Sequence, residues 1–315
     1  MPTPSDHFDG LRYFNPSGAN GQPFWKLPRL LATPKTRWPS EVQVQPRRPP
    51  ILGEPEIVVT FVGHSTFLIQ TAGINVLIDP VYADRASPLS FAGPRRARLP
   101  GVRFDDLPPT SLVLLSHNHY DHCDLGTLRR LEQRFHPMAV TPPGNGRLLR
   151  AAGFSKIEEL DWWQTSRAAP LRVTVTPAQH FSARTLFDRN RALWGGFLIE
   201  TGGRRVYHTG DSGYGPHFRE ISARLGPIDL ALIPIGAYEP RWFMRDIHMN
   251  PAEAVQAHLD LGARQSVAMH FGTFQLTPEG IDQPVRDLAN ALREQGVPAE
   301  EFRTIEVGES VHVGR

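Results

Sequence analysis

The chain has almost no cysteine, no long apolar segment and very little lysine. Cys123 is the single cysteine in 315 residues. An internal disulfide is therefore excluded and a reducing compartment is indicated. No apolar run approaches the roughly 20 residues that a membrane-spanning helix needs. Residues 1–7 carry neither the basic nor the apolar segment of a secretory signal. These absences predict a cytoplasmic location, with a peripheral position on the inner face of a membrane as the alternative.

An excess of charge of one sign is also missing. Lysine and arginine number 34 against 32 aspartates and glutamates, which gives a formal net charge of +2. Because no long basic tail is present either, nucleic acid is not an expected partner. Arg95, Arg96 and Arg98 form a small cluster, and guanidinium groups pair well with phosphate oxygens. Two interpretations stay open for this cluster: a phosphate-binding entrance or anionic membrane contact, and a solvated loop.

The most informative motif follows the apolar run at residues 111–115 and reads Ser-His-Asn-His-Tyr-Asp-His over residues 116–122. It contains three imidazoles and one carboxylate within six residues. Four such side chains on a short loop can hardly reach a single point, so the motif predicts two neighbouring metal ions. Imidazole and carboxylate donors suit Zn²⁺ or a similar first-row ion. A lone histidine is usually a core or surface residue, whereas the complete pattern indicates metal binding.

Three later segments place a further ligand type where a predicted strand ends. Residues 171–176 lead to His180, residues 204–208 lead to Asp211, and residues 266–269 end at His270. Chemistry on layered α/β sheets usually sits at the carboxyl ends of strands. The candidate metal ligands are therefore seven, enough for two ions if one carboxylate bridges: His117, His119, Asp121, His122, His180, Asp211 and His270.

The coarse pattern of elements predicts a β-rich α/β fold. Strands are expected at residues 57–62, 66–70 and 74–78, with glycines in the turns between them. A helix is expected over residues 125–135, and another begins after Asn250 and ends at Gly262. A third helix is expected to open at Thr277-Pro278-Glu279 and to run to about residue 295.

The order of these ligands resembles the metallo-β-lactamase fold superfamily. Further blocks at residues 61–66, 84–88, 91–94, 182–184, 187–190 and 238–244 resemble its N-acyl-phosphatidylethanolamine-hydrolysing phospholipase D branch. The resemblance covers residues 55 to 295, approximately. It implies a four-layer αββα sandwich formed by residues 51–315, a metallo-β-lactamase-like hydrolase domain. Residues 1–50, rich in proline, glycine and asparagine, are interpreted as an irregular N-terminal arm.

The resemblance also implies how the ligands are shared between two metals. One metal would be held by His117, His119 and His180, the other by Asp121, His122 and His270, and Asp211 would bridge them. The implied cofactors are two Zn²⁺ per chain, with iron or manganese as alternatives. Diiron members usually carry glutamate at the position of His119, so zinc is favoured. Two such ions lower the pKa of a bridging water and make hydroxide available for hydrolysis, without a serine or cysteine nucleophile.

Three further residues are candidates for supporting roles. Asp79 ends a predicted strand and could orient a ligand histidine, although a turn cap before a proline is the alternative. His64 could act in the same way or be structural. The resemblance implies that His248 lies near the metals, where it contacts the substrate phosphate or protonates the leaving group, and a surface histidine is the alternative. The candidate catalytic residues are thus Asp121 and His248.

The resemblance implies cleavage of N-acyl-phosphatidylethanolamine to phosphatidic acid and an N-acylethanolamine. A lactonase or other ester hydrolase of the same fold is the main alternative. A nuclease and a non-enzymatic metal protein are weaker ones. The expected partners are a phospholipid or another small ester, and the resemblance adds a homodimer. The segment at residues 23–31 mixes apolar and basic side chains, so it could rest on a membrane or pack against the sandwich.

Overall fold

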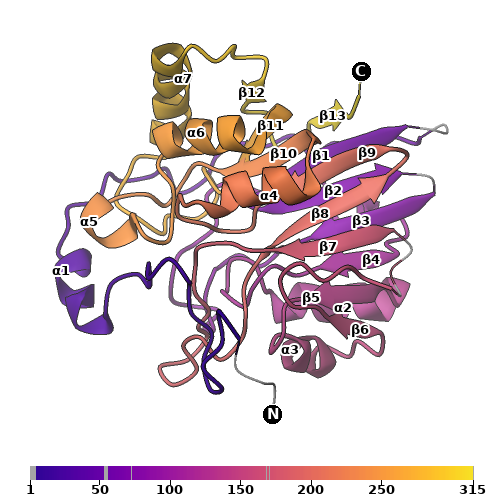
Figure 1. Ribbon diagram of the computed structural model, residues 1–315, viewed down its shortest axis with the longest axis horizontal. Helices are drawn as coiled ribbons and strands as arrows, with labels where there is room; N and C mark the ends of the chain where they lie inside the picture. Colours follow the sequence, from indigo (N-terminus) through magenta and orange to yellow (C-terminus); the bar gives the residue numbers. More distant parts are fainter. Residues whose placement is uncertain (1–4, 53–55, 72, 168, 170, 315) are drawn as a thin grey trace.

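The computed structural model describes residues 5–52, 56–71, 73–167, 169 and 171–314. In this part of the chain, two β-sheets lie face to face with helices outside them (Figure 1). The first sheet has the order β13-β1-β2-β3-β4-β5-β6. Its strands are β1 (Ile57–Gly63), β2 (Thr66–Thr71), β3 (Ile74–Ile78), β4 (Leu112–Leu114), β5 (Met138–Thr141), β6 (Ile157–Glu159) and β13 (Ser310–His312).

The second sheet has the order β12-β11-β10-β9-β8-β7. Its strands are β7 (Arg172–Thr176), β8 (Gly196–Thr201), β9 (Arg204–His208), β10 (Ile228–Pro234), β11 (Ala263–Met269) and β12 (Phe302–Arg303). The helices are α1 (Leu27–Leu31), α2 (Leu125–Phe135), α3 (Gly146–Ala151), α4 (His217–Leu225), α5 (Arg241–Met244), α6 (Pro251–Leu261) and α7 (Gln283–Gln295), with 3₁₀ turns at Phe24–Lys26 and Phe104–Asp106.

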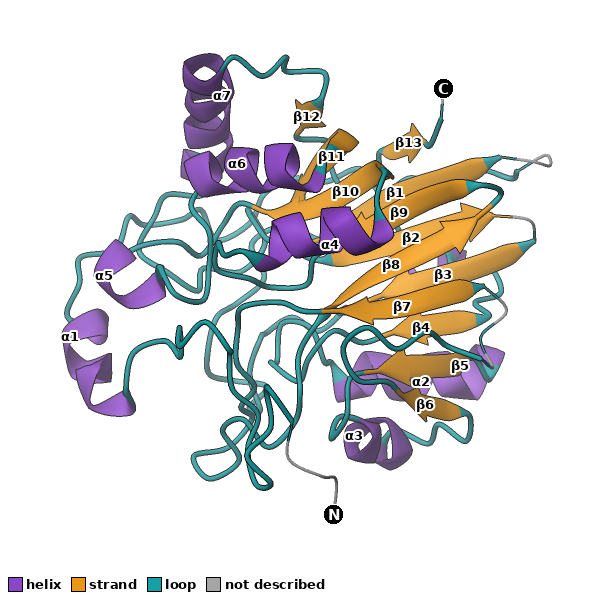
Figure 2. Ribbon diagram, viewed as in Figure 1, coloured by secondary structure: helices purple, strands orange, loops and turns teal. Residues whose placement is uncertain are grey.

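Strand β2 shows why the fold has four layers. Successive side chains of a strand point to opposite faces of the sheet. Phe67 and Ile69 join the core between the two sheets, whereas Leu68 joins a second cluster with Leu128 and Leu131 of α2. Because all three side chains are fully buried, both faces of the first sheet must be covered. Figure 2 shows α4 in front of the strands and α2 behind them, so the predicted four-layer αββα sandwich is confirmed.

The helices follow their expected bounds in two cases out of three. Helix α2 covers residues 125–135, and Asp124 caps it through the N–H groups of residues 126 and 127. Helix α6 begins with the expected capping box, in which Asn250 and Glu253 bond to each other's backbone. It ends at Gly262, whose φ of 59° lies in the left-handed region that glycine tolerates.

The predicted start of the last helix is wrong, because α7 begins at Gln283 and not near Pro278. Pro284 explains the difference. Proline is favoured in the first turn of a helix, but in a helix interior it lacks an N–H donor and its ring clashes with the preceding turn. A helix opening at residue 278 would have placed Pro284 in its interior. The preceding backbone instead binds the N-terminal segment: the Trp38 indole donates to Glu279 O, and the Thr36 N–H donates to Pro278 O.

The described part of the predicted arm, residues 5–50, lies along the sandwich. Phe8 and Tyr13 are buried in the main core. Further along, Val42 forms an isolated bridge with Arg98. Helix α1 lies beside α5, where the Arg29 guanidinium sits 4.4 Å from the centre of the Trp242 ring (Figure 1). Among the described residues, the structure contains no helix with the length and apolar character required to cross a bilayer.

Candidate metal centre

The candidate residues converge because the strands that precede them run in the same direction within each sheet. Strands β1 and β3 are both antiparallel to β2, and β4 is parallel to β3. In the other sheet β7 and β9 are antiparallel to β8, and β11 follows β10 and β9 in parallel. The residues after the carboxyl ends of these strands are His64, Asp79, residues 117–122, His180, Asp211 and His270. The polar residues that follow these strands therefore lie at one edge of the sandwich.

The first group of donors consists of His117, His119 and His180. His117 Nε2 lies 2.9 Å from His119 Nδ1, and His180 Nε2 lies 3.2 Å from the same atom. The other ring nitrogen of His180 donates to Ile247 O at 2.9 Å, which turns Nε2 toward the group. Three imidazoles with converging nitrogens are a common zinc-binding arrangement.

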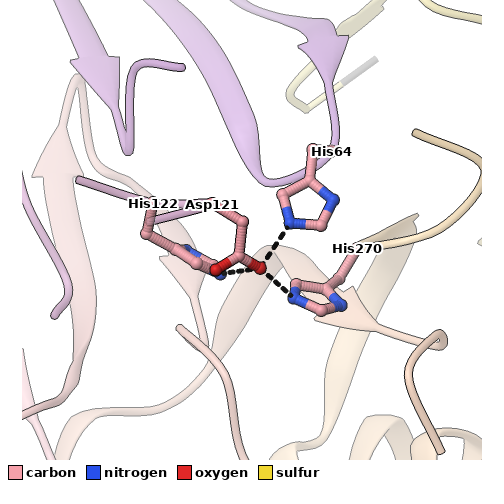
Figure 3. A group of neighbouring side chains, drawn as sticks. All are labelled: His64, Asp121, His122 and His270. Atoms are coloured by element: carbon pink, nitrogen blue, oxygen red, sulfur yellow. Dashed lines mark hydrogen bonds and ion pairs between the residues drawn. The ribbon is translucent and has the colours of Figure 1, made fainter. Parts of the chain in front are cut away.

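The second group consists of His64, Asp121, His122 and His270 and is drawn in Figure 3. Asp121 Oδ2 lies at its centre, 2.9 Å from His64 Nε2, 3.3 Å from His270 Nε2 and 3.6 Å from His122 Nε2. All four side chains are buried. This group contains the three residues expected for the second metal and adds His64.

Asp211 lies between the two groups. Its Oδ2 is 3.1 Å from the Nε2 atoms of both His122 and His270. The same oxygen is 3.9 Å from His117 Nε2 and 3.8 Å from His180 Nε2. One carboxylate thus faces nitrogens of both donor groups, as a bridging ligand would.

Burial and an unpartnered carboxylate oxygen indicate that the donor set fits metal ions. Oδ1 of Asp211 has no hydrogen-bond partner among the described residues, and the Nε2 atoms of His122 and His270 face carboxylate oxygens of Asp121 and Asp211. Asp211, His122 and His270 are at most 3% exposed. Buried polar atoms are normally paired, so an unpartnered carboxylate oxygen beside converging imidazole nitrogens fits a divalent ion.

The electrostatics of the first group favour the neutral imidazoles that a metal requires. Burial, together with the neighbouring His180, lowers the pKa of His119 to about 3. Burial also lowers the pKa of His180 to about 4. Both rings are therefore neutral at pH 7 and offer a nitrogen lone pair.

In the second group, buried carboxylates and imidazoles compensate one another. Burial alone would raise the pKa of Asp211, but His122 and His270 hold it well below its ordinary value. Burial would lower the pKa of His270, but Asp211 and Asp121 outweigh burial and raise it to about 9. In this arrangement the histidine protons balance the carboxylate charge. Metal binding would displace those protons.

Asp79 stands behind His122. Its Oδ2 accepts from His122 Nδ1 at 2.8 Å and from the Ser116 hydroxyl at 2.5 Å, while its Oδ1 accepts from the Ser116 N–H at 2.7 Å. The Ser116 hydroxyl oxygen also lies 2.9 Å from His117 Nδ1. Asp79 therefore fixes the ring of His122 with Nε2 toward the centre, which is the geometry of a ligand-orienting carboxylate. The sequence motif did not indicate this role for Ser116.

His248 is buried beside the first group, so the alternative of a surface histidine is wrong. It is 6% exposed, and it forms a third potential ligand group with His180 and Asp211. Its ring centre lies 5.0 Å from that of His180 and 5.1 Å from that of His270. Burial holds its pKa well below the ordinary value. The position fits a residue that meets a substrate at the metal centre.

Backbone conformation is unusual at this edge of the sandwich. His64, Asp79 and His270 have φ values of 58°, 42° and 61°, in the left-handed region that non-glycine residues rarely adopt. Each residue follows the carboxyl end of a strand. Such conformations persist where surrounding contacts enforce them, and they cluster at functional sites.

Two arginines of the cluster at residues 95–98 bind other parts of the chain. Arg96 is buried, donates to the carbonyl oxygens of Val81 and Ala83, and lies 4.7 Å from the Phe274 ring centre. Arg98 pairs with Glu306 at 3.4 Å. The interpretation of a phosphate-binding entrance is therefore wrong for Arg96. Its guanidinium instead holds the backbone of the loop at residues 81–83.

The fold and the donor cluster define the class: this is a metal-dependent hydrolase built on a metallo-β-lactamase sandwich. The model of the beta-lactamase superfamily domain matches residues 74–271. The chain belongs to this superfamily. Within it, the chain is related to an N-acyl-phosphatidylethanolamine-hydrolyzing phospholipase D 1 from Caenorhabditis elegans, with 38% identity over 270 residues, 81% of this chain and 76% of that protein.

Two further similarities agree with this assignment. An uncharacterized protein of Mycobacterium tuberculosis is 42% identical over 246 residues, 76% of this chain, but the match spans only 65% of the mycobacterial protein. The solved structure of a metallo hydrolase from the archaeon Ignicoccus hospitalis has a TM-score of 0.63 at 23% identity, covering 82% of this chain and 99% of that one. The structural likeness supports the fold alone.

Proposed function

We propose that this chain is a two-zinc phosphodiesterase of phospholipase D type that cleaves N-acyl-phosphatidylethanolamine-like lipids. The observation that carries the proposal is the position of Asp211 Oδ2, which faces both donor groups. The name of the Caenorhabditis elegans relative supports the choice of substrate. A lactone or other ester substrate is the alternative that the experiment below must separate.

The proposed ligands are the two groups described above. His117, His119 and His180 would hold one ion, Asp121, His122 and His270 the other, and Asp211 both. When bound, two divalent ions supply Lewis acidity and activate water near neutral pH. His64 Nε2 hydrogen-bonds to the Asp121 carboxylate (Figure 3). The hydrogen bond from His122 Nδ1 to Asp79 fixes the orientation of the His122 ring.

His248 and Asp121 would act on the reacting groups. The buried His248 ring is neutral near pH 7, so its N–H can donate a hydrogen bond to a phosphate oxygen. To protonate the leaving alcohol oxygen, the ring would first have to take up a second proton, for example from the attacking water. Asp121 lies at the centre of the second group and would orient the attacking water through a carboxylate oxygen. Burial of both side chains excludes bulk water from these contacts.

Apolar side chains beside the centre offer a surface for acyl chains. The Phe181 ring centre lies 4.5 Å from that of His119. Phe181 packs against a small apolar cluster formed by Ala237, Phe243, Met244 and Ile247. Farther out, Leu186 and Phe187 are 93% and 80% exposed on the loop that follows Phe181. We propose that this loop contacts the lipid surface that presents the substrate.

The function is tested by metal analysis together with product analysis. Purified protein should contain about two zinc ions per chain. It should release phosphatidic acid from N-acyl-phosphatidylethanolamine, and His119→Ala or Asp211→Asn should abolish this release in folded protein. Opening of lactones alone would keep the metal centre and replace the substrate. Iron in place of zinc would redirect the proposal to oxidative chemistry.

The homodimer and the division into an arm and a hydrolase domain stay predictions. Light scattering on the purified protein measures the mass of the particle in solution. A mass near twice the 35.2 kDa of one chain supports the dimer. A mass of one chain contradicts it.

A further inference from the structure

The loop that carries four of the proposed ligands belongs to no strand or helix. Residues 116–123, here called the metal loop, connect β4 to α2. Asp79 holds its first residue by accepting from the N–H and hydroxyl of Ser116. Farther along the metal loop, buried backbone carbonyls require donors from another segment, because such groups are nearly always paired.

Arg184 provides this donor. Its Nη1 donates to the carbonyl oxygen of Asn118 at 2.8 Å and to that of Cys123 at 2.8 Å. These two carbonyls flank residues 119–122, which contribute three of the proposed ligands. A single guanidinium nitrogen therefore ties together the two ends of the ligand-bearing stretch.

Other contacts fix the position of the Arg184 side chain. Its guanidinium carbon lies 3.9 Å from the centre of the Tyr120 ring, a cation–π geometry. The Tyr120 hydroxyl donates to the Arg184 carbonyl oxygen at 2.9 Å. Asp188 Oδ1 accepts from the N–H groups of Arg184 and Thr185 at 2.9 and 2.8 Å. The side chain of Arg184 and its backbone carbonyl are thus both anchored on the metal loop, and Asp188 holds its backbone N–H.

We propose that Arg184 is a positioning residue for the metal centre, which sets the geometry of His119, Asp121 and His122 through the backbone of the metal loop. This inference rests on the proposed function, because it takes these side chains to be metal ligands. Lysine cannot replace Arg184, since it lacks the planar face that stacks on Tyr120. The segment around Arg184 follows His180 by only a few residues, so the same loop constrains ligands of both donor groups.

Titration of the metal-free protein with Co²⁺ tests the proposal without a substrate, because Co²⁺ absorption reports ligand geometry. In Arg184→Ala and Arg184→Lys we expect at least one Co²⁺ to bind about 10–100-fold more weakly, with an altered spectrum. Arg224→Gln is the matched control. Its guanidinium also stacks on an aromatic ring, Trp163 at 4.2 Å, but it pairs with Glu220 on α4. This control should bind Co²⁺ as wild type does.

Rescue separates positioning from a folding defect. Added guanidinium ions should restore Co²⁺ affinity in Arg184→Ala and leave Arg184→Lys unchanged, whereas a misfolded protein would not recover. Tyr120→Phe removes only the hydroxyl and should give a smaller loss, so it tests the contact even if Arg184→Ala fails to fold. Wild-type affinity and spectrum in Arg184→Lys and Tyr120→Phe would overturn the positioning role and leave the proposed function intact. A wild-type protein that binds no Co²⁺ would overturn both.

Discussion

At the scale of single residues, Asp79 shows how a side chain that faces away from the substrate can decide the properties of the centre. Asp79 is fully buried, and it accepts from His122 Nδ1 and from Ser116. Asn at this position keeps the shape but loses the charge and one acceptor oxygen. We expect Asp79→Asn to weaken zinc binding about 10–100-fold. Competition with a chelator measures this affinity.

The control for Asp79→Asn is Asp229→Asn, which removes a carboxylate that pairs with Arg204 away from the metal centre. Its zinc affinity should equal that of wild type. Equal zinc affinities in Asp79→Asn and wild type would contradict the orienting role of Asp79.

Cys123 is the second residue whose behaviour follows from its surroundings. The side chain is fully buried, and burial raises its pKa to about 12. The raised pKa means that the reactive thiolate increases only at strongly alkaline pH, so about one molecule in 10⁴ carries it at pH 8. We expect iodoacetamide to leave Cys123 unmodified in the native protein between pH 7 and 9, and to modify it after denaturation. Rapid native modification, read by mass spectrometry, would contradict this expectation and show a thiol that is accessible and ionised, as in a redox-sensing cysteine.

The local environment explains which single residues the sequence could indicate. The ligands at residues 117–122 can be recognised in the sequence because their residue types and spacing form a local pattern. Ser116 and Arg184 act through hydrogen bonds to backbone groups or to residues distant in the chain, and such contacts leave no pattern in one sequence. His64 was a candidate, but its place within the second donor group depends on the turn between β1 and β2.

At the scale of elements, the proposed metal ligands lie just after the ends of strands, and caps define the ends of the helices. Strands of this kind, in which a polar residue follows an apolar run, could be predicted from the sequence. A strand whose two faces are both buried has apolar side chains along its whole length. Helix α6 could be predicted from its caps. The predicted start of α7 is wrong, since residues 277–279 resemble a helix opening and the prediction does not use the signal of Pro284. Contacts with the N-terminal segment hold the loop before the helix.

The exposed loop after His180 is expected to contact a lipid surface. Leu186 and Phe187 stand out from it, and apolar groups at a lipid interface gain free energy on burial. We expect the double variant Leu186→Ser, Phe187→Ser to reduce co-sedimentation with anionic vesicles by about 10-fold or more. Leu259→Ser on α6 removes another half-exposed apolar side chain and serves as the control. Unchanged vesicle binding in the double variant would contradict lipid contact by this loop.

At the scale of the whole molecule, the metal centre depends on segments from almost the entire chain. The donors come from both sheets, and even the N-terminal segment reaches them, because Asn15 Nδ2 donates to His180 O at 2.8 Å. Composition predicts an irregular N-terminal arm over residues 1–50. It could not predict this docking, which rests on buried side chains such as Phe8 and Tyr13.

His7 makes the docking of the N-terminal segment depend on pH. Its Nε2 lies 2.7 Å from Asp161 Oδ1, and its ring stacks on Trp162 at 4.3 Å. Burial alone would lower the pKa of His7, but its bonds to Asp161 and Asp6 outweigh burial and raise it. A raised pKa stabilises the folded state fully below the ordinary histidine value of about 6.5, and this stabilisation is lost as pH rises through the folded pKa.

We therefore expect His7→Gln to lower the free energy of unfolding by about 1 kcal/mol at pH 6 and by less at pH 8.5, because the ion pair exists only with protonated His7. Asp161→Asn should behave in the same way. The comparison must stay above pH 5, since the lowered pKa of Asp161 means that its own contribution declines only in acid. Denaturant unfolding at the two pH values measures the difference. A loss of equal size at both pH values would show that His7 anchors the segment by packing on Trp162 and not by charge.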